Sequence, residues 1–324
     1  MLLHTKTLRT STALSCILFH ANNAVKQEEC LQKKFPEEKN TDNKLAYQTR
    51  VYFHIWGYRE NEITNATSFL VMLRNPVDRV MSSYKYSHPE NCNDNTRMHL
   101  PWGCEVAKDK KWNQTETHPA YELYRKCFPY ASRLEDFAQA TMSPWNPIKH
   151  FMETNMTMKD RWNCRKVARS ALQGHTKGNT HPHMRYNYEY YARKSIWKFP
   201  GKEVFGIRTE HEWNDMVQLD KLLGGTGNFT NEAKSVSHGS EKYIPAPVSE
   251  SAYHKLCCVL EREIEIYMDL LDSVENLSKQ QKQESIDSVR EKCGIADLSW
   301  THWRMQCRST IEADTLTLEK NLQG

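Results

Sequence analysis

The chain has 324 residues, 39% of them hydrophobic, and its mean hydropathy of −0.78 is typical of a protein with a polar surface. Its 44 basic and 40 acidic residues leave a formal net charge of +4, which is too small to indicate nucleic-acid binding. No stretch approaches the roughly eighteen apolar residues of a transmembrane helix, so we expect any membrane attachment to use an anchor outside this chain.

The first twenty residues are predicted to form a strand, a loop and the start of a helix. The loop carries Lys6, Thr7, Thr10 and Ser11. A lysine and hydroxyl groups before a helix favour an anion, because the helix dipole and its unpaired N–H groups attract negative charge there. The same segment has a second interpretation as a signal peptide, with an apolar core at 13–19 that polar residues interrupt.

A second strand is predicted at 47–57, which is rich in β-branched and aromatic residues. His54 lies within it. Histidine accepts a proton near neutral pH, so His54 could serve as a general base. An isolated strand histidine is also often a core residue, and both interpretations stay open.

The strongest functional signal begins with the apolar run 68–72, which predicts a buried strand of a parallel sheet. Pro76 cannot continue a central strand, and apolar residues at helical spacing follow from Val77. Arg74 therefore lies at the carboxyl end of a strand, where open α/β sheets bind their ligands.

The helix that follows carries two neighbouring serines, Ser82 and Ser83, about two turns from its start. The guanidinium of Arg74 and one of these hydroxyls would together suit a phosphate dianion. The alternative is a strand-turn-helix with a structural Arg–Asp pair and a serine of no special role.

The later elements are predicted from periodicity and capping signals. In chain order they are an irregular insertion at 88–183, a strand at 203–208, a helix after it, a loop at 235–242, a long amphipathic helix at 249–276 and a polar, partly helical extension at 277–324. Thr209 and Glu212 have the spacing of a capping box, so the helix after the strand should begin at Thr209.

Ten cysteines without a CxxC pair argue against a zinc cluster and favour disulfides. Plausible local pairings are Cys92–Cys104, Cys127–Cys164 and Cys293–Cys307, although spacing alone does not establish connectivity. Five glycosylation sequons, which begin at 65, 113, 155, 228 and 276, also suit a lumenal or secreted protein. No metal site is expected, because the histidines at 175, 181 and 183 have no acidic residue at ligand spacing.

The motif Arg-x-Pro-x-x-Arg-x-x-Ser at 74–82 resembles the 3′-phosphate-binding segment of sulfotransferases that use 3′-phosphoadenosine 5′-phosphosulfate (PAPS). The closest similarity is to the carbohydrate branch, which includes uronyl 2-O- and galactose sulfotransferases. The loop at Lys6 resembles the 5′-phosphosulfate loop of that family, except that its proline is missing and Leu8 and Arg9 replace glycines. A Walker loop is absent from the sequence, which argues against an ordinary kinase.

The resemblance implies an α/β fold of the P-loop-like, three-layer type, with a central parallel sheet and helices on both faces. It implies a sulfotransferase domain at 1–276, with its acceptor site built by the insertion, and a peripheral extension at 277–324. Cofactor contacts would come from Lys6, Thr7, Thr10, Ser11, Arg74, Ser82 and Lys242. Lys6 and His54 would be the catalytic residues, and Arg79 would brace the loop.

The resemblance also implies that the acceptor is a hydroxyl group, expected to be that of a glycan, and that the protein is a type II membrane protein of the Golgi lumen. A secreted protein is the alternative for the compartment. For the activity, the alternatives are transfer to a small alcohol or a tyrosyl protein, or a non-catalytic binding protein that retains the fold. The altered loop at Leu8 and Arg9 keeps the non-catalytic alternative open.

Overall fold

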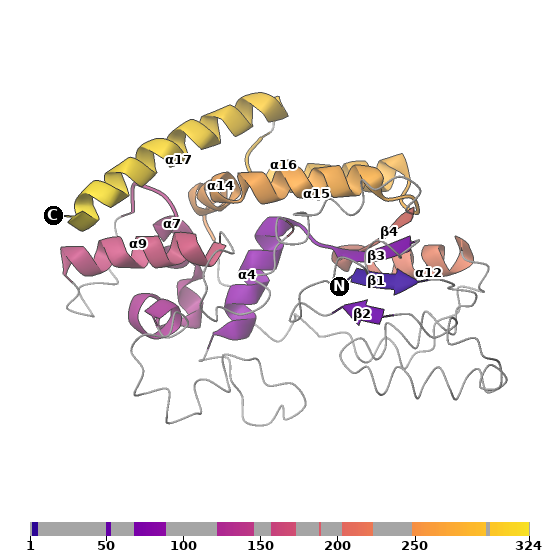
Figure 1. The fold of residues 1–324 in the computed structure, drawn as a ribbon, viewed down its shortest axis with the longest axis horizontal. Coiled ribbons are helices and arrows are strands. Elements are labelled where there is room, and N and C mark those ends of the chain that lie inside the picture. The colour runs from indigo at the N-terminus through magenta and orange to yellow at the C-terminus, as the bar shows by residue number, and fades with distance from the viewer. Residues whose placement is uncertain are drawn as a thin grey trace, which may run out of the picture. The chain divides into compact units, whose positions relative to one another are not determined.

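The computed structural model divides the chain into two compact units (Figure 1). The first comprises Met1–Arg74, Ala192–Gly239 and Tyr267–Glu284, and the second Asn75–Tyr191, Ser240–Ile266 and Ser285–Gly324. The residues that the structure describes are 2–5, 50–52, 68–88, 122–145, 157–172, 188, 203–222, 248–295 and 299–323. The predicted domain at 1–276 and extension at 277–324 remain predictions.

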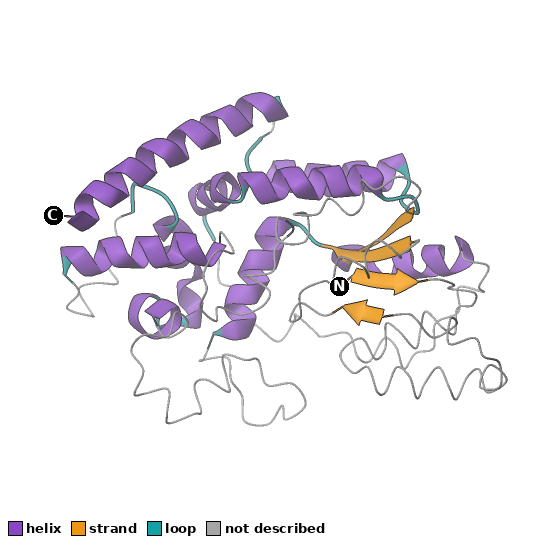
Figure 2. Ribbon diagram, viewed as in Figure 1, coloured by secondary structure: helices purple, strands orange, loops and turns teal. Residues whose placement is uncertain are grey.

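The described part of the first unit contains a sheet with the strand order β2-β1-β3-β4 (Figure 2). The strands are β1 (Leu2–Thr5), β2 (Arg50–Tyr52), β3 (Ser68–Leu73) and β4 (Glu203–Arg208). β3 and β4 are parallel, whereas β1 is antiparallel to both β2 and β3. The α/β class is thus confirmed coarsely, but among the described strands only β3 and β4 run parallel. Apolar composition indicates a buried strand and not its direction, so the sequence did not reveal the orientation of β1.

β3 and β4 form the buried centre of this unit. Leu70, Leu73, Val204 and Ile207 are each at most 1% exposed. Continuous apolar strands of this kind are typical of parallel strands covered on both faces. The helix α12 (Glu212–Leu222) packs against β4.

The link between β4 and α12 differs from the predicted capping box. A 3₁₀ turn, η7 (Thr209–His211), stands between them, and α12 begins only at Glu212. The hydroxyl of Thr209 bonds the carboxylate of Glu210 at 3.2 Å and caps nothing. Asp215 instead accepts the backbone N–H of Arg208, the residue before the 3₁₀ turn, at 2.9 Å.

The outer edge of β4 is closed by the residues after α15 (Glu261–Ser273). The backbone N–H of Glu275 donates to the carbonyl of Val204 at 2.8 Å. The carboxamide of Asn276 accepts the N–H of Gly206 at 2.7 Å and donates to the carbonyl of the same residue at 2.8 Å. These bonds occupy backbone groups that an open sheet edge would offer to another chain.

Gly206 leaves no room for a side chain. An added Cβ would lie 2.6 Å from Cδ1 of Leu73 and 3.0 Å from Cγ1 of Val274. We expect Gly206→Ala to lower the free energy of unfolding by about 1–3 kcal/mol, measured by urea denaturation, because the packed neighbours must shift.

Gly294→Ala is the contrasting variant. Its site is open, but its φ of +66° suits glycine, so we expect a loss of about 1 kcal/mol from backbone strain alone. A smaller loss at Gly206 than at Gly294 would contradict the close packing.

The described part of the second unit is helical. Its elements are α4 (Pro76–Ser87), the π-helix η4 (Glu122–Cys127), the 3₁₀ turn η5 (Ala131–Arg133), α7 (Leu134–Ala140), α9 (Met158–Leu172), α14 (Glu250–Val259) and α17 (Trp300–Gln323). Two further helices, α15 and α16 (Lys279–Lys292), cross the boundary between the units. Tyr84 of α4 stacks on Phe137 of α7, with ring centroids 4.8 Å apart. Both side chains are fully buried, so α4 and α7 share one core.

The predicted long helix at 249–276 is two helices. Ser249 caps α14, its hydroxyl accepting the N–H of Ala252 at 3.2 Å, and the helix ends at Val259. α15 then begins at Glu261. The apolar period continues through the break because Leu260 is itself buried, so periodicity did not reveal it.

Among the described residues of the second unit, three disulfides link its helices. Cys127–Cys164 was predicted and is confirmed. The predicted pair Cys293–Cys307 is wrong, because Cys293 bonds Cys257 and Cys307 bonds Cys258. The adjacent cysteines near the end of α14 thereby join that helix to the end of α16 and to α17. The predicted pair Cys92–Cys104 lies outside the described residues.

A buried group of charges lies where α9 meets α17. The carboxylate of Asp314 accepts two contacts of 2.7 Å from Arg165, one of 3.2 Å from Arg169 and one of 3.1 Å from the backbone N–H of Ser143. All three charged residues are at most 6% exposed.

Burial and the neighbouring charge of Arg165 lower the pKa of Lys255, whose ammonium bonds the carbonyl of Pro144.

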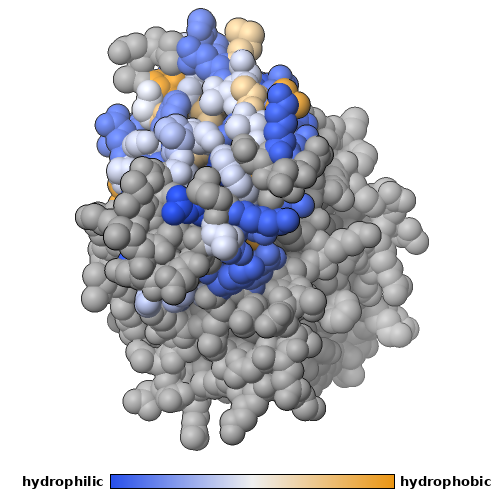
Figure 3. All heavy atoms as spheres, turned by 90° about the vertical axis from the view of Figure 1, so that its left-hand side faces the viewer, coloured by the Kyte–Doolittle hydropathy of each residue, from blue (hydrophilic) through white to orange (hydrophobic). Residues whose placement is uncertain are grey.

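The described surface is mostly hydrophilic on the face that Figure 3 shows, with a few apolar residues scattered on it. Among the helices of the described ranges, none is both long and apolar enough to cross a membrane.

Candidate functional site

The predicted strand, turn and helix at 68–84 are all present. β3 ends at Leu73, Arg74 follows it, and α4 begins at Pro76. Asn75 caps this helix, its side-chain oxygen accepting the N–H of Val77 at 3.0 Å. The turn is short because a cap and a proline at the first helical position start the helix at once.

Arg74 is half-buried at the carboxyl edge of the parallel pair. The register pairs Leu73 of β3 with Arg208 of β4, so Arg74 is the first residue beyond the paired strands. This is the edge at which parallel sheets bind ligands. The structure therefore places an arginine where the motif predicted one.

Arg79, which was expected to brace the loop, makes an ion pair with a residue of α15. Its Nε and one terminal nitrogen bond the carboxylate of Glu263 at 2.9 and 2.7 Å. Glu263 is 3% exposed, and its carboxylate also accepts the backbone N–H of Tyr188 at 3.4 Å. This two-pronged pair fixes α4 against α15.

The two candidate serines of α4 differ in exposure. Ser83 is 2% exposed, whereas Ser82 is half-buried. Of the two, Ser82 is thus the more accessible to a ligand. Arg74 belongs to the first unit and Ser82 to the second, and the structure describes each in its own unit.

The remaining predicted site residues lie outside the described residues. They are Lys6, Thr7, Thr10, Ser11, His54 and Lys242. Within the described ranges, histidines, cysteines and carboxylates form no group of three or more that could hold a metal ion.

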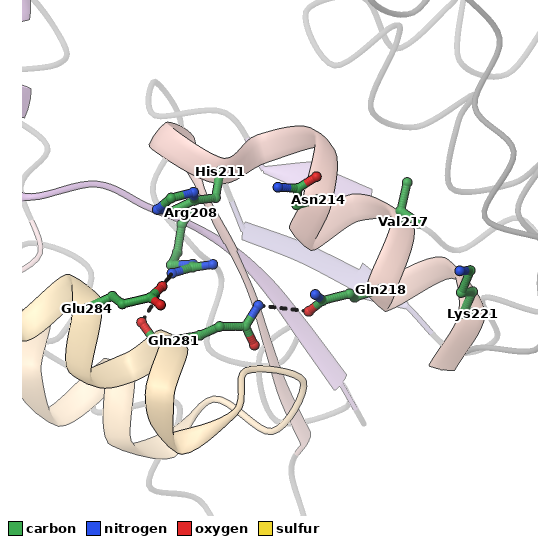
Figure 4. Close-up of a pocket in the computed structure, with 8 residues that line it drawn as sticks. All are labelled: Arg208, His211, Asn214, Val217, Gln218, Lys221, Gln281 and Glu284. Atoms are coloured by element: carbon green, nitrogen blue, oxygen red, sulfur yellow. Dashed lines mark hydrogen bonds and ion pairs between the residues drawn. The ribbon is translucent and has the colours of Figure 1, made fainter.

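A pocket of about 440 Å³ lies beside the end of β4, between α12 and the first turns of α16 (Figure 4). Its lining is polar except for one valine. The residues are Arg208, His211, Asn214, Val217, Gln218, Lys221, Gln281 and Glu284. Gln281 bonds Gln218 at 2.8 Å and so links the two walls.

Arg208, at one end of the pocket, is held by protein groups. Its guanidinium makes two bonds of 2.8 Å to Asp215 and contacts Glu284 at 3.2 Å. Burial disfavours its charge, but the bonds to Asp215 outweigh burial and keep the pKa of Arg208 above its ordinary value. Arg208 is therefore a structural cation.

Three other polar side chains of the pocket are open to a ligand. His211, Asn214 and Lys221 are exposed, and none of these side chains is engaged by another residue in the part of the chain that the structure describes. Sequence reasoning missed them. Their spacing with Gln218, at intervals of three and four after a strand, is the signal that could have found this polar helix face.

No protein-family model, curated protein or solved structure matches this chain.

Proposed function

We propose that the protein transfers a sulfuryl group from PAPS to a hydroxyl group of an acceptor. The observation that carries this proposal is the turn after β3, where Arg74 stands at the carboxyl edge of a parallel pair and α4 begins two residues later. The motif Arg-x-Pro-x-x-Arg-x-x-Ser spans this turn and the first turns of α4.

The 3′-phosphate of the cofactor would bind to Arg74 and Ser82. The planar guanidinium of Arg74 can donate two parallel bonds to a phosphate, and a hydroxyl adds a third. The exposure of Ser82 favours it over the buried Ser83. Arg79 is engaged by Glu263 and would support α4 without touching the cofactor.

The transfer step needs an acceptor hydroxyl in line, a base to take its proton, and positive charge for the phosphate that leaves. We assign the base to His54 and the positive charge to Lys6. Thr7, Thr10 and Ser11 would hold the 5′-phosphosulfate, and Lys242 would approach the cofactor from a later loop. No metal has a role in this proposal.

The proposed fold is P-loop-like and three-layered, with helices on both faces of the sheet. The parallel pair β3–β4 supports it, while the antiparallel β1 departs from it. The proposed acceptor is a glycan hydroxyl and the proposed compartment the Golgi lumen. The three disulfides found in the described ranges support an oxidising compartment.

The test is thermal unfolding with 3′-phosphoadenosine 5′-phosphate, the desulfated cofactor. A ligand at 100 times its dissociation constant stabilises the folded state by about 2.7 kcal/mol, so we expect the melting temperature of the wild type to rise by several degrees. Arg74→Ala should abolish this rise, because the bidentate phosphate contact is lost.

Arg262→Ala is the matched control, since this arginine is exposed on α15 and should leave the shift unchanged. A well-folded wild type that shows no shift, or an equal shift in Arg74→Ala, would refute the assignment. A shift without any transfer from labelled PAPS would favour the non-catalytic binding protein.

A further inference from the structure

The side chain of Asn276 is bonded to both backbone groups of one residue. Its oxygen accepts the N–H of Gly206 at 2.7 Å, and its nitrogen donates to the carbonyl of Gly206 at 2.8 Å. The carboxamide therefore pairs with β4 much as the backbone of a neighbouring strand would. It is held in place by Leu277, which is 5% exposed, and by the bond from Glu275 to Val204.

The geometry of this pair specifies which amide hydrogen is used. Both contacts go to the same residue, so the oxygen and the donated hydrogen of Asn276 must point in the same direction. The nitrogen carries two hydrogens, one on the side of the oxygen and one pointing away from it. The first of these makes the bond to Gly206.

Asn276 also begins a glycosylation sequon, Asn276-Leu277-Ser278. Glycosylation forms a bond from the side-chain nitrogen to C1 of a sugar, while the bond from C1 to its pyrophosphate leaving group breaks and a proton leaves the nitrogen. The product is a secondary amide. It prefers the trans form by about 2.5–4 kcal/mol, like any non-proline amide.

In the trans form the sugar lies on the same side of the amide as its oxygen. That is the position of the hydrogen that Asn276 donates to Gly206. A glycan at this residue would thus remove the bond and stand against β4, while the remaining hydrogen points away from the strand.

From this geometry we infer that Asn276 is not an N-glycan acceptor in the folded protein, and that its carboxamide serves to close the edge of the sheet. The sequon and the fold use the same hydrogen, so one chain cannot satisfy both. The inference is independent of the proposed enzymatic activity. The sequons at 65, 113, 155 and 228 lie outside the described residues.

The first experiment measures glycan occupancy at Asn276. The full chain, directed into the secretory pathway of cultured cells by an added cleavable signal peptide, is recovered from cell lysate and medium. It is treated briefly with protease, and the resistant fraction is mapped by mass spectrometry after enzymatic deglycosylation in ¹⁸O-labelled water. We expect almost no labelled aspartate at 276 in this folded fraction. Occupancy there in most of the folded molecules would overturn the inference.

The second experiment needs no glycan. Asn276→Asp keeps the shape of the side chain but removes the N–H that donates to Gly206. We therefore expect the melting temperature of this variant to fall by roughly 3 °C or more. Ser278 is the N-cap of α16, accepting the N–H of Gln281 at 3.2 Å, so the sequon must be removed without losing this cap. Ser278→Asp does so, and its melting temperature should stay within about 1 °C of wild type. Equal melting temperatures for Asn276→Asp and wild type would refute the role in edge closure.

Discussion

Asp314→Ala is expected to lower the free energy of unfolding by about 3–5 kcal/mol, because it leaves Arg165 and Arg169 buried without their carboxylate. Arg165 is the more affected, since it is 2% exposed and the contact that remains to it within the described ranges is the ring of Trp162, with its guanidinium carbon 5.2 Å from the ring centre. Urea denaturation followed by circular dichroism measures the loss.

Glu312→Ala is the control, since this residue is exposed on the same helix and should change stability by less than about 0.5 kcal/mol. If Asp314→Ala cost no more than Glu312→Ala, the buried charges would have to be paired elsewhere.

The same carboxylate predicts a pH dependence. Burial raises the pKa of Asp314, but hydrogen bonds from Arg165 and Ser143 and the nearby arginine charges outweigh burial and hold it below its ordinary value. A carboxylate with a lowered pKa adds stability above its unfolded pKa of about 3.9, and this stability is lost as the pH falls through the folded pKa. The difference in stability between wild type and Asp314→Asn should therefore be constant near neutrality and shrink below about pH 4. A difference that grows in acid would contradict the pairing.

Replacing both Cys258 and Cys307 with serine removes their bridge and should lower the free energy of unfolding by about 4 kcal/mol. The bridge closes a loop of 49 residues, and opening it restores conformational freedom to the unfolded chain. Thermal and urea unfolding of the double variant against wild type measure the loss.

The matched variant removes the bridge between Cys257 and Cys293, which closes 36 residues and should cost nearly as much. Unchanged unfolding of the wild type after full reduction would show that these bridges do not stabilise the protein.

Local signals predicted the region around Arg74 well. An apolar run indicates a strand that is covered on both faces. An asparagine followed by a proline favours a helix start, and this signal needs only neighbouring residues. The positions of β3, α4 and β4 therefore followed from neighbouring residues. Cys127–Cys164 was also predicted, although its cysteines are 37 residues apart; they lie in η4 and α9, which contact each other.

Features that depend on distant residues were not predicted. The direction of β1 depends on its partner strands, and the pairing of Cys257 and Cys258 depends on where α16 and α17 return to α14. The pocket beside β4 was missed because its two walls are far apart in sequence. Gln281 meets Gln218 only after the chain has passed through α14 and α15.

The adjacent bridges at Cys257 and Cys258 also determine how the chain carries a mechanical load. A force applied to the two chain ends passes from Cys258 across the sulfur bridge to Cys307 and bypasses the residues between them. That segment would extend to about 170 Å if it were free, at about 3.4 Å per residue. While the bridge is intact, the force cannot extend this segment. α15, α16 and the first turns of α17 are therefore shielded from tension that extends the rest of the chain.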